Sequence, residues 1–584
     1  MAENDDRIIQ QFMWGYQVYF QTSVETYLRI ALREVGFTGK ADVILVGFQA
    51  QGEHRFPICF EPEDGPYEPS VLANVASRGQ ELYEQHSDRN MFYTDPQTDE
   101  EFHERLQRQM RSRAVEEALA SSEPGAGRTV FAGMPIRVDD YNVHVVISVD
   151  HASLASVPQL RTTMRDRLTV YPSLVHAVIH DALNRASRGL LIPDPGRDLD
   201  VLGARPAEIV QSATTSFVRS VFGCAGYWFA DKAELIVNSI SALPYEGRSG
   251  SGRLVIAKAD HPAVDVLMKF IEAVDIENTR ATRKLLEASG SAADLLSTGE
   301  KILGLGRLTA AYDAATEAAF TVSVIARGTW ELWHADQVLM TVRDGTPQLP
   351  RPPLNAAYLT DVEERLLPGA DQARLLMLAE AAGRHQHGAM LVISSDAAGE
   401  AQRLTPQAWT VEPVLLAPEL LSQLTSMDGG VLIDSQGYCH AVGVILDGQA
   451  CGGEDPARGS RYNNAVRYLE SEAPQAVVVV YSADGGIDVL PRIRPRVKQS
   501  MVQQAVDQYL SLATPGKRQS GRADAWEQVR RLMFYLSEDQ CRVLNEARAA
   551  LNRWAEEHDY IVEIVQPLAP NPDMNGTYWL PEEG

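Results

Sequence analysis

The chain has 584 residues, which at roughly 150 residues per domain predicts several separate cores rather than one. Its formal net charge of -25 opposes general binding to nucleic acids or anionic membranes, so a phosphate-bearing ligand would need a local basic pocket. Scattered cysteines without metal-ligand spacing, and the lack of an apolar run near the roughly 20 residues of a membrane-spanning helix, favour a reduced cytoplasmic protein without a membrane span.

Residues 1–155 are expected to form an N-terminal α+β region with the layout of a sensor. Apolar residues at helical spacing from Asp6 to Val35 precede two short strands between Ala41 and Phe60. A charged helix from Asp99 to Glu123 and strand-like alternation from Thr129 to Val149 complete the region.

Residues 156–334 are expected to form a second α/β region. Helical patterning covers Val157 to Ser187 and Pro206 to Val221, and a strand is predicted from Arg253 to Lys258. Two apolar, β-branched runs around Gly328-Thr329-Trp330 predict a further strand pair near its end.

Residues 335–500 predict an α/β domain with a central mixed β-sheet flanked by helices, and residues 501–584 predict a mainly helical region. The chain as a whole is therefore expected to be a multidomain α+β protein. The expected strands of the α/β domain are Gly388–Ser394, Gly430–Asp434, Tyr438–Leu446, Ala476–Tyr481 and Ile487–Pro491, and its expected helices are Arg374–Arg384, Ala417–Leu424 and Asn463–Ser471.

The segment Met427-Asp428-Gly429-Gly430 places a carboxylate next to two glycines at the start of a predicted strand. A nucleotide could approach the backbone closely there, and the Asp428 carboxylate could hold a divalent cation or accept a proton from a hydroxyl. Taken alone, the segment is also explained as a simple turn that enters a strand.

The segment Gly459-Ser460-Arg461-Tyr462-Asn463 leads into a predicted helix. Free amide groups at a helix start, a serine hydroxyl and a guanidinium group together suit a phosphate. Taken alone, the segment is also explained as the capped start of a surface helix.

In this order and spacing, the segments resemble the diadenylate cyclase domain family, first described in the DNA-integrity scanning protein. The resemblance rests on five segments: Gly388-Ala389-Met390-Leu391-Val392, Met427-Asp428-Gly429-Gly430, Gly443-Val444-Ile445-Leu446, Gly459-Ser460-Arg461-Tyr462-Asn463, and Val477 to Ser482. It covers about a hundred residues closely.

The resemblance implies that two ATP molecules are condensed into cyclic di-AMP with Mg²⁺ or Mn²⁺, across a face-to-face pair of domains. It assigns metal binding or hydroxyl activation to Asp428 and phosphate binding to Arg461. The other residues that it implies in nucleotide binding are Gly429, Gly430, Leu446, Gly459, Ser460, Tyr462, Asn463 and Ser482. We expect the acidic turn and the arginine-bearing helix start to converge on one triphosphate.

Two positions depart from the family pattern. Tyr462 replaces the family histidine and Asn463 replaces its second arginine, which removes two cationic donors. Losing one such contact can cost on the order of 3 kcal/mol of transition-state stabilisation. Arg458 and Arg467 are the nearby cations that could compensate. The sequence therefore keeps open a non-catalytic regulator that binds ATP or a cyclic dinucleotide, and an enzyme that makes a different dinucleotide.

Overall fold

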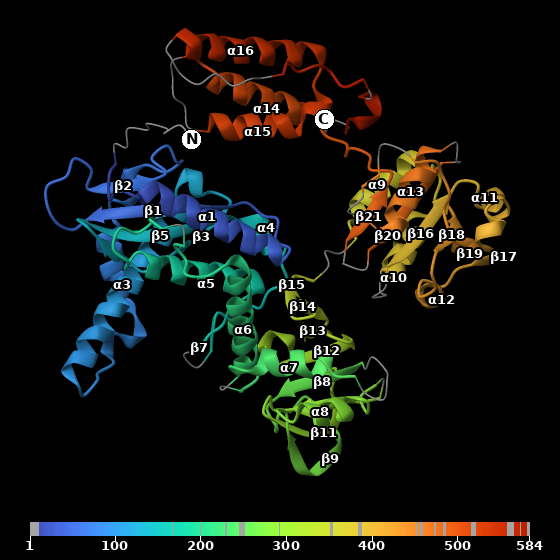
Figure 1. The fold of residues 1–584 in the computed structure, drawn as a ribbon, viewed down its shortest axis with the longest axis horizontal. Helices are drawn as coiled ribbons and strands as arrows, with labels where there is room; N and C mark the ends of the chain where they lie inside the picture. Colours follow the sequence, from blue (N-terminus) through green and yellow to red (C-terminus); the bar gives the residue numbers. More distant parts are fainter. Residues whose placement is uncertain are drawn as a thin grey trace. The chain divides into compact units, whose positions relative to one another are not determined.

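The computed structural model of the chain describes residues 11–165, 168–198, 200–227, 230–244, 251–290, 292–350, 354–383, 388–450, 454–455, 459–471, 475–482, 486–515, 521–557, 566–572 and 574–580. They form two compact units, Met1–Pro350 and Arg351–Gly584. Figure 1 shows the elements of both units, and each unit is described by itself.

The first sheet of unit one is antiparallel, with the order β2-β1-β5-β3 and β4 paired to β5. Its strands are β1 (Ala41–Gln49), β2 (Ile58–Glu61), β3 (Arg128–Ala132), β4 (Ile136–Val138) and β5 (Tyr141–Asp150). β1 and β5 pair along their whole length, and alternate residues of each strand enter different cores on the two faces.

Helices cover both faces of this sheet. On one face lie α1 (Gln17–Glu34) and α5 (Leu174–Gly189), with α6 (Pro206–Cys224) packed against these two helices, and on the other face lie α2 (Val75–Gln85) and α3 (Pro96–Ala120). α1 buries Phe20, Val24 and Leu28 at helical spacing, as its sequence predicted. α3 begins where Asp95 accepts the Thr98 amide proton and a proline occupies the first turn.

The helix predicted over Val157–Ser187 is wrong in its first half. α4 (His151–Ala155) ends before this range, which begins with the short strand pair β6 (Met164–Arg165) and β7 (Leu168–Thr169), and α5 starts only at Leu174. Pro172 disfavours helical backbone at the residue before it, and Ser173 caps the new helix by accepting the His176 amide proton.

The second sheet of unit one has eight strands in the order β15-β14-β13-β12-β8-β10-β11-β9. α7 (Ala233–Ala242) and α8 (Thr279–Leu286) pack with it. Its strands are β8 (Gly252–Ala257), β9 (Val264–Asp275), β10 (Asp294–Ser297), β11 (Lys301–Leu308), β12 (Ala319–Ala326), β13 (Thr329–His334), β14 (Gln337–Arg343) and β15 (Thr346–Gln348). β13 pairs with β14 across the boundary expected after residue 334, so the break between the units lies after Pro350 instead.

Unit two contains a mixed sheet with the order β17-β19-β18-β16-β20-β21. Its strands are β16 (Ala389–Ser394), β17 (Trp409–Leu415), β18 (Gly430–Asp434), β19 (Tyr438–Val444), β20 (Ala476–Tyr481) and β21 (Ile487–Leu490). β16 and β18 run parallel and the other neighbours are antiparallel. This confirms the predicted central mixed sheet, and β17 is the strand that the sequence analysis missed.

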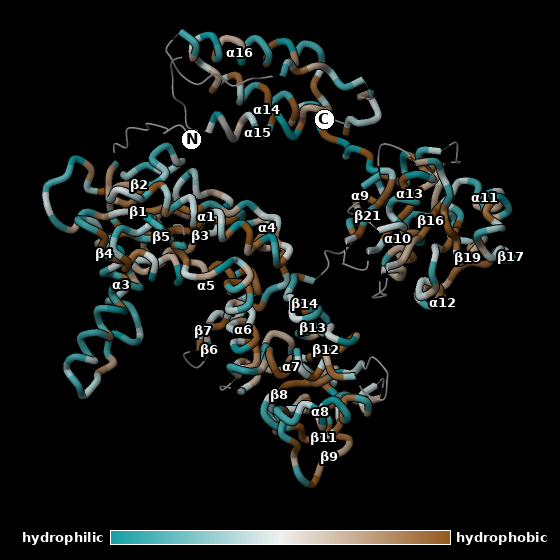
Figure 2. The backbone as a smooth tube through the Cα atoms, viewed as in Figure 1, coloured by the Kyte–Doolittle hydropathy of each residue, from teal (hydrophilic) through white to brown (hydrophobic). Residues whose placement is uncertain are grey.

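Two helical layers cover this sheet. α9 (Ala356–Leu366), α10 (Gln372–Ala382) and α12 (Pro418–Leu424) bury one face, and α11 (Ala397–Arg403) and α13 (Ser460–Glu470) bury the other. The residues of β16 and β20 are buried on both faces of the sheet. Figure 2 shows hydrophobic colour along these central strands.

The chain ends in the predicted helical region, with α14 (Gln499–Leu512), α15 (Arg522–Arg531) and α16 (Glu538–Glu557) around a core of their own. Among the helices that the structure describes, none combines the length and the hydropathy of a bilayer-spanning segment.

Candidate functional site

The acidic turn before β18 depends on glycine for its shape. Gly429 has a φ of +98°, and a Cβ there would lie 2.6 Å from the carbonyl carbon of Gly443 on β19. Gly443 has a φ of +63°, and its own Cβ would lie 2.5 Å from the Trp409 ring. A side chain at Gly430 would meet Met390. The hairpin therefore requires these glycines for folding, whatever binds next to them.

Asp428, by contrast, has no structural role that requires a carboxylate. Its side chain is 95% exposed, and its hydrogen-bond partners among the described residues are Arg461 and the amide of Gly429, which lies 3.0 Å from Oδ1. An exposed carboxylate on a glycine turn is available to a ligand.

The first turn of α13 supplies the second half of the site. Gly459 precedes the helix with extended backbone and provides no side-chain cap for the amide groups that follow. Ser460 is exposed at the first helical position. The helix start therefore has N–H groups without a side-chain cap and an exposed hydroxyl, the arrangement that favours a phosphate.

Arg461 joins the two halves. Its Nη2 lies 3.0 Å from Asp428 Oδ1, although the two residues are 33 positions apart. Its Nε is buried without a partner among the described residues, so part of its hydrogen-bonding capacity is unused. The structure thus brings together the acidic turn and the helix start that the sequence analysis expected to converge.

The side chains of Tyr462 and Asn463 both contact other residues of the chain. Tyr462 is 7% exposed in the core below α13, with the Arg492 guanidinium 5.6 Å from its ring centroid. The Asn463 amide group accepts from the Asp455 amide at 2.9 Å and donates to the Asp455 carbonyl at 3.0 Å. The two positions that depart from the family pattern are therefore packed or bonded within the chain.

Of the two nearby cations that the sequence offers, Arg467 is the one that the structure describes. Arg467 forms an ion pair with Glu454. Arg458 lies outside the described residues.

Leu446 and Ser482 take different places. Leu446 is buried, 3% exposed, in the core between the sheet and α13. Ser482 follows β20, and its amide donates to Gly486 at 2.8 Å. No hydrogen bond or ion pair between described residues joins either of them to Asp428 or Arg461.

A buried polar network holds α13 in place, and the sequence analysis missed it. The Tyr468 hydroxyl donates to Glu400 at 3.0 Å, and both side chains are nearly inaccessible. Arg403 binds the same carboxylate at 2.8 Å and Asp447 at 2.9 Å. Burial, followed by the charge of Glu400, raises the pKa of Tyr468 and keeps its hydroxyl protonated as a donor. The network ties α11 and the segment after β19 to the helix that carries Arg461.

An exposed apolar rim, which we define as Trp409, Met427 and Ile445, was also missed. Trp409 is 66% exposed and lies against Gly443, which in turn contacts Gly429. Met427 precedes Asp428, and Ile445 follows β19; they are 38% and 47% exposed. The available signal in the sequence was a tryptophan in a polar stretch. Large apolar groups that are exposed mark ligand or protein contacts.

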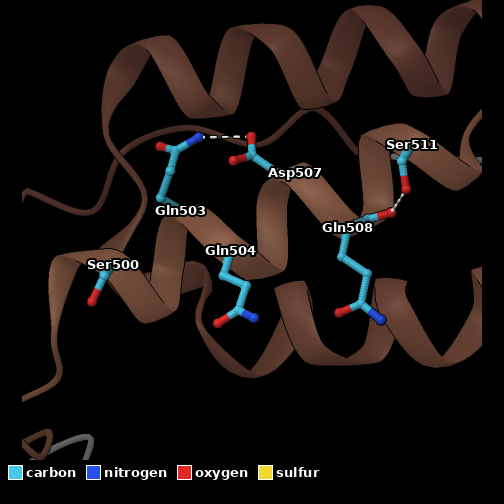
Figure 3. Close-up of a pocket in the computed structure, with 6 residues that line it drawn as sticks. All are labelled: Ser500, Gln503, Gln504, Asp507, Gln508 and Ser511. Carbon is cyan, nitrogen blue, oxygen red and sulfur yellow. Dashed lines mark hydrogen bonds between the residues drawn. The ribbon is translucent and has the colours of Figure 1, made fainter.

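Two other surfaces of unit two differ from the site around Asp428. A hollow along α14 is lined by Ser500, Gln503, Gln504, Asp507, Gln508 and Ser511. Figure 3 shows Gln503 bonded to Asp507, and no cation lines the hollow. After β21, Arg492 pairs with Asp488, and Arg496 pairs with Asp361 and Glu364.

Three family models match the chain. Residues 13–218 match a model described as "Probable sensor domain DACNG", and residues 234–336 match "Probable sensor domain DACNH". Residues 378–492 match "DisA bacterial checkpoint controller nucleotide-binding". The third match spans Asp428 and Arg461, and it confirms the resemblance predicted from the motifs.

Two solved structures are similar to part of the chain. A double mutant of DacA from Staphylococcus aureus is 19% identical, with 20% of this chain and 81% of that chain covered and a TM-score of 0.18. A hypothetical membrane spanning protein from Bacillus cereus is also 19% identical, with 23% and 67% covered and a TM-score of 0.19. No curated protein matches the chain.

Proposed function

We propose that this chain, whose residues 378–492 match the DisA nucleotide-binding model, is a multidomain diadenylate cyclase that condenses two ATP molecules into cyclic di-AMP in the cytoplasm. In each of two equivalent steps, the 3′-hydroxyl oxygen of one ATP bonds to the α-phosphorus of the other. The bond from that phosphorus to the bridging oxygen of pyrophosphate breaks, and the hydroxyl proton leaves to a base. The products are cyclic di-AMP and two pyrophosphates.

The contact between Asp428 and Arg461 is the observation that carries this proposal. Arg461 would donate to phosphate oxygens, and the open first turn of α13 would add amide donors and the Ser460 hydroxyl. Asp428 would take the hydroxyl proton or hold the metal ion. Phosphoryl transfer depends mainly on positioning and on charge stabilisation, so this small set of groups suffices.

A divalent ion fits the site if the triphosphate supplies most of its ligands. No group of three or more His, Cys, Asp or Glu side chains gathers into a metal site among the described residues. Mg²⁺ commonly binds through one or two carboxylates together with substrate phosphates, and Asp428 offers one exposed carboxylate. Mg²⁺ or Mn²⁺ bound there would neutralise phosphate charge.

Self-association would complete the reaction, because each domain holds one ATP and the nucleophile of one must reach the phosphorus of the other. The exposed Asp428 and the apolar rim beside it support such a surface. The sensor-like domains of unit one would regulate the pairing.

One observation favours the alternative, a regulator that binds nucleotide without turnover. Tyr462 and Asn463 are committed to the core and to Asp455, so the site lacks two cations that the family pattern provides. Nucleotide binding without product would identify this case.

The test is incubation of the full chain with ATP and Mn²⁺, followed by mass spectrometry of the products. We expect cyclic di-AMP from the wild type and none from Asp428→Asn. The matched control is Glu419→Gln, which changes an exposed carboxylate on α12 of the same domain and should leave the yield unchanged. Absence of cyclic di-AMP at high protein concentration would overturn the cyclase proposal.

A further inference from the structure

The sheet face that α2 and α3 cover in unit one is mostly apolar, yet it holds two polar side chains side by side. His144 on β5 is 0% exposed and lies opposite Val46 of β1. The Arg111 guanidinium on α3 lies 4.8 Å from the Phe48 ring centroid. The Phe48 and His144 rings meet edge to face with centroids 5.7 Å apart. Arg111 and His144 therefore both pack against the Phe48 ring.

The hydrogen bonds of His144 define its tautomer. Its Nδ1 lies 2.9 Å from the Gly133 carbonyl oxygen, which also accepts from the Ser112 hydroxyl at 2.9 Å. A carbonyl only accepts, so Nδ1 carries the proton and Nε2 is left as an acceptor. Burial lowers the pKa of His144 to about 3, so the ring is neutral at physiological pH. Nε2 is buried and has no donor partner among the described residues.

Arg111 forms no ion pair with any residue that the structure describes. Its Nε is buried without a partner among the described residues, and burial lowers the pKa of its guanidinium. The nearby carboxylates on α3 are used elsewhere: Glu116 accepts from the Ala132 amide at 2.8 Å, and Glu117 pairs with Arg113 and Arg78. Arg108, the other cation close to His144, donates to Pro135.

These two unsatisfied groups are complementary. A desolvated cation without a counterion is costly to the fold, and buried acceptors without donors are rare. One molecule with a negatively charged oxygen and an O–H group would satisfy both. Arg111 is half-buried, so part of its side chain is accessible from solvent.

We propose that Arg111 and His144 bind a small oxyanion that carries its own hydrogen-bond donor. The anionic oxygen would accept from the Arg111 guanidinium, and the hydroxyl of the ligand would donate to His144 Nε2. Monoprotonated phosphate and an α-hydroxy acid share this chemistry. The site lies within the residues that match a sensor-domain model, so its ligand would be a signal for unit one. The proposal goes beyond the cyclase function, because this binding needs neither ATP nor turnover.

Calorimetric titration of the full chain at pH 7 tests the proposal with four probes: inorganic phosphate, lactate, sulfate and acetate. Phosphate and lactate carry an O–H group at this pH, whereas sulfate and acetate do not. We expect phosphate or lactate to bind, and sulfate and acetate to bind at least roughly tenfold more weakly, since each would leave a buried acceptor unpaired. Equal affinity for all four anions, or no binding at millimolar concentration, would overturn the proposal.

Arg111→Met identifies the location of the bound probe, and Arg113→Met on the exposed side of the same helix is the matched control. We expect Arg111→Met to weaken binding roughly tenfold to a hundredfold, and Arg113→Met to leave it unchanged. Wild-type affinity in Arg111→Met would place the anion elsewhere and contradict the site.

Thermal unfolding without ligand separates a binding role from a structural one. Since Arg111 has no counterion, we expect Arg111→Met to unfold at the wild-type temperature or above it. A clear loss of stability would show that Arg111 has a structural role in the fold, and it would contradict a role in binding alone. Arg111→Lys, which keeps the charge, should retain part of the binding.

Discussion

Asp428 and Arg461 meet at 3.0 Å, but their surroundings differ. The aspartate is almost fully in solvent, whereas the arginine is partly buried and keeps an unused Nε. In solvent such an ion pair contributes at most about 1 kcal/mol to stability. The fold therefore gains little from this pair, and our proposal that it binds a ligand leaves the stability of the domain nearly independent of it.

Gly429→Ala tests how strictly the hairpin limits this turn. The new Cβ would meet Gly443 at 2.6 Å in backbone with positive φ, so we expect a stability loss of about 1–3 kcal/mol. Urea unfolding measures it. Gly459→Ala is the control, because nothing lies within 4 Å of its Cβ and its φ is -67°. Equal stability of the two variants would contradict the close approach of the strands.

Glu363 on α9 predicts a dependence of stability on pH. It is 0% exposed, and both carboxylate oxygens lack a partner among the described residues. Burial raises its pKa to about 7, so between its ordinary value and pH 7 the folded state binds more protons than the unfolded state. Stability of unit two should therefore fall as the pH rises from about 5 to 8.

Denaturant unfolding across that pH range checks this expectation. Glu363→Gln should remove much of the decline, and Glu412→Gln, which changes an exposed carboxylate on β17, should keep it. A wild-type slope in Glu363→Gln would show that other groups cause the pH dependence.

Among the elements, the sequence predicted the strands that are buried on both faces and the helices that are clearly amphipathic. β18 and β20 were predicted at their observed bounds, and α10 and α12 within a few residues. β17 was missed because Pro413 interrupts its pattern, which an edge strand tolerates at a register shift. The contact of Asp428 with Arg461 could be expected only from the family resemblance, because spacing along the chain does not fix sheet topology.

The network under α13 could not be predicted, because its partners come from three separate segments. Tyr468→Phe should destabilise unit two by about 1–3 kcal/mol, since it leaves the buried Glu400 carboxylate with one partner fewer. Tyr438→Phe, at an exposed tyrosine of β19, is the control for the substitution itself. Urea unfolding compares the stability of the two variants. Identical midpoints would show that the buried hydroxyl contributes nothing.

At the level of the whole molecule, the proposed reaction needs two copies of the nucleotide domain. The apolar rim beside Asp428 is the surface that supports this pairing. A single domain holds one ATP in this account, so turnover must depend on encounter of two domains.

We expect the rate of cyclic di-AMP formation per chain to rise with protein concentration until pairing saturates. Trp409→Ala should shift this rise to higher concentration, because it removes the largest exposed apolar group of the rim. Leu191→Ala, at an exposed leucine of unit one, is the control. A rate per chain that is constant from low to high concentration would contradict the need for self-association.

The central claim is that Asp428 and Arg461 act on a single triphosphate. Titration with 3′-deoxy-ATP and Mn²⁺ measures this directly, because the analogue lacks the attacking hydroxyl and cannot be turned over. The account predicts that Arg461→Met weakens binding roughly tenfold or more and that Asp428→Asn reduces the gain from Mn²⁺, while Glu419→Gln binds as the wild type does. Wild-type, Mn²⁺-dependent affinity in both Arg461→Met and Asp428→Asn would contradict it.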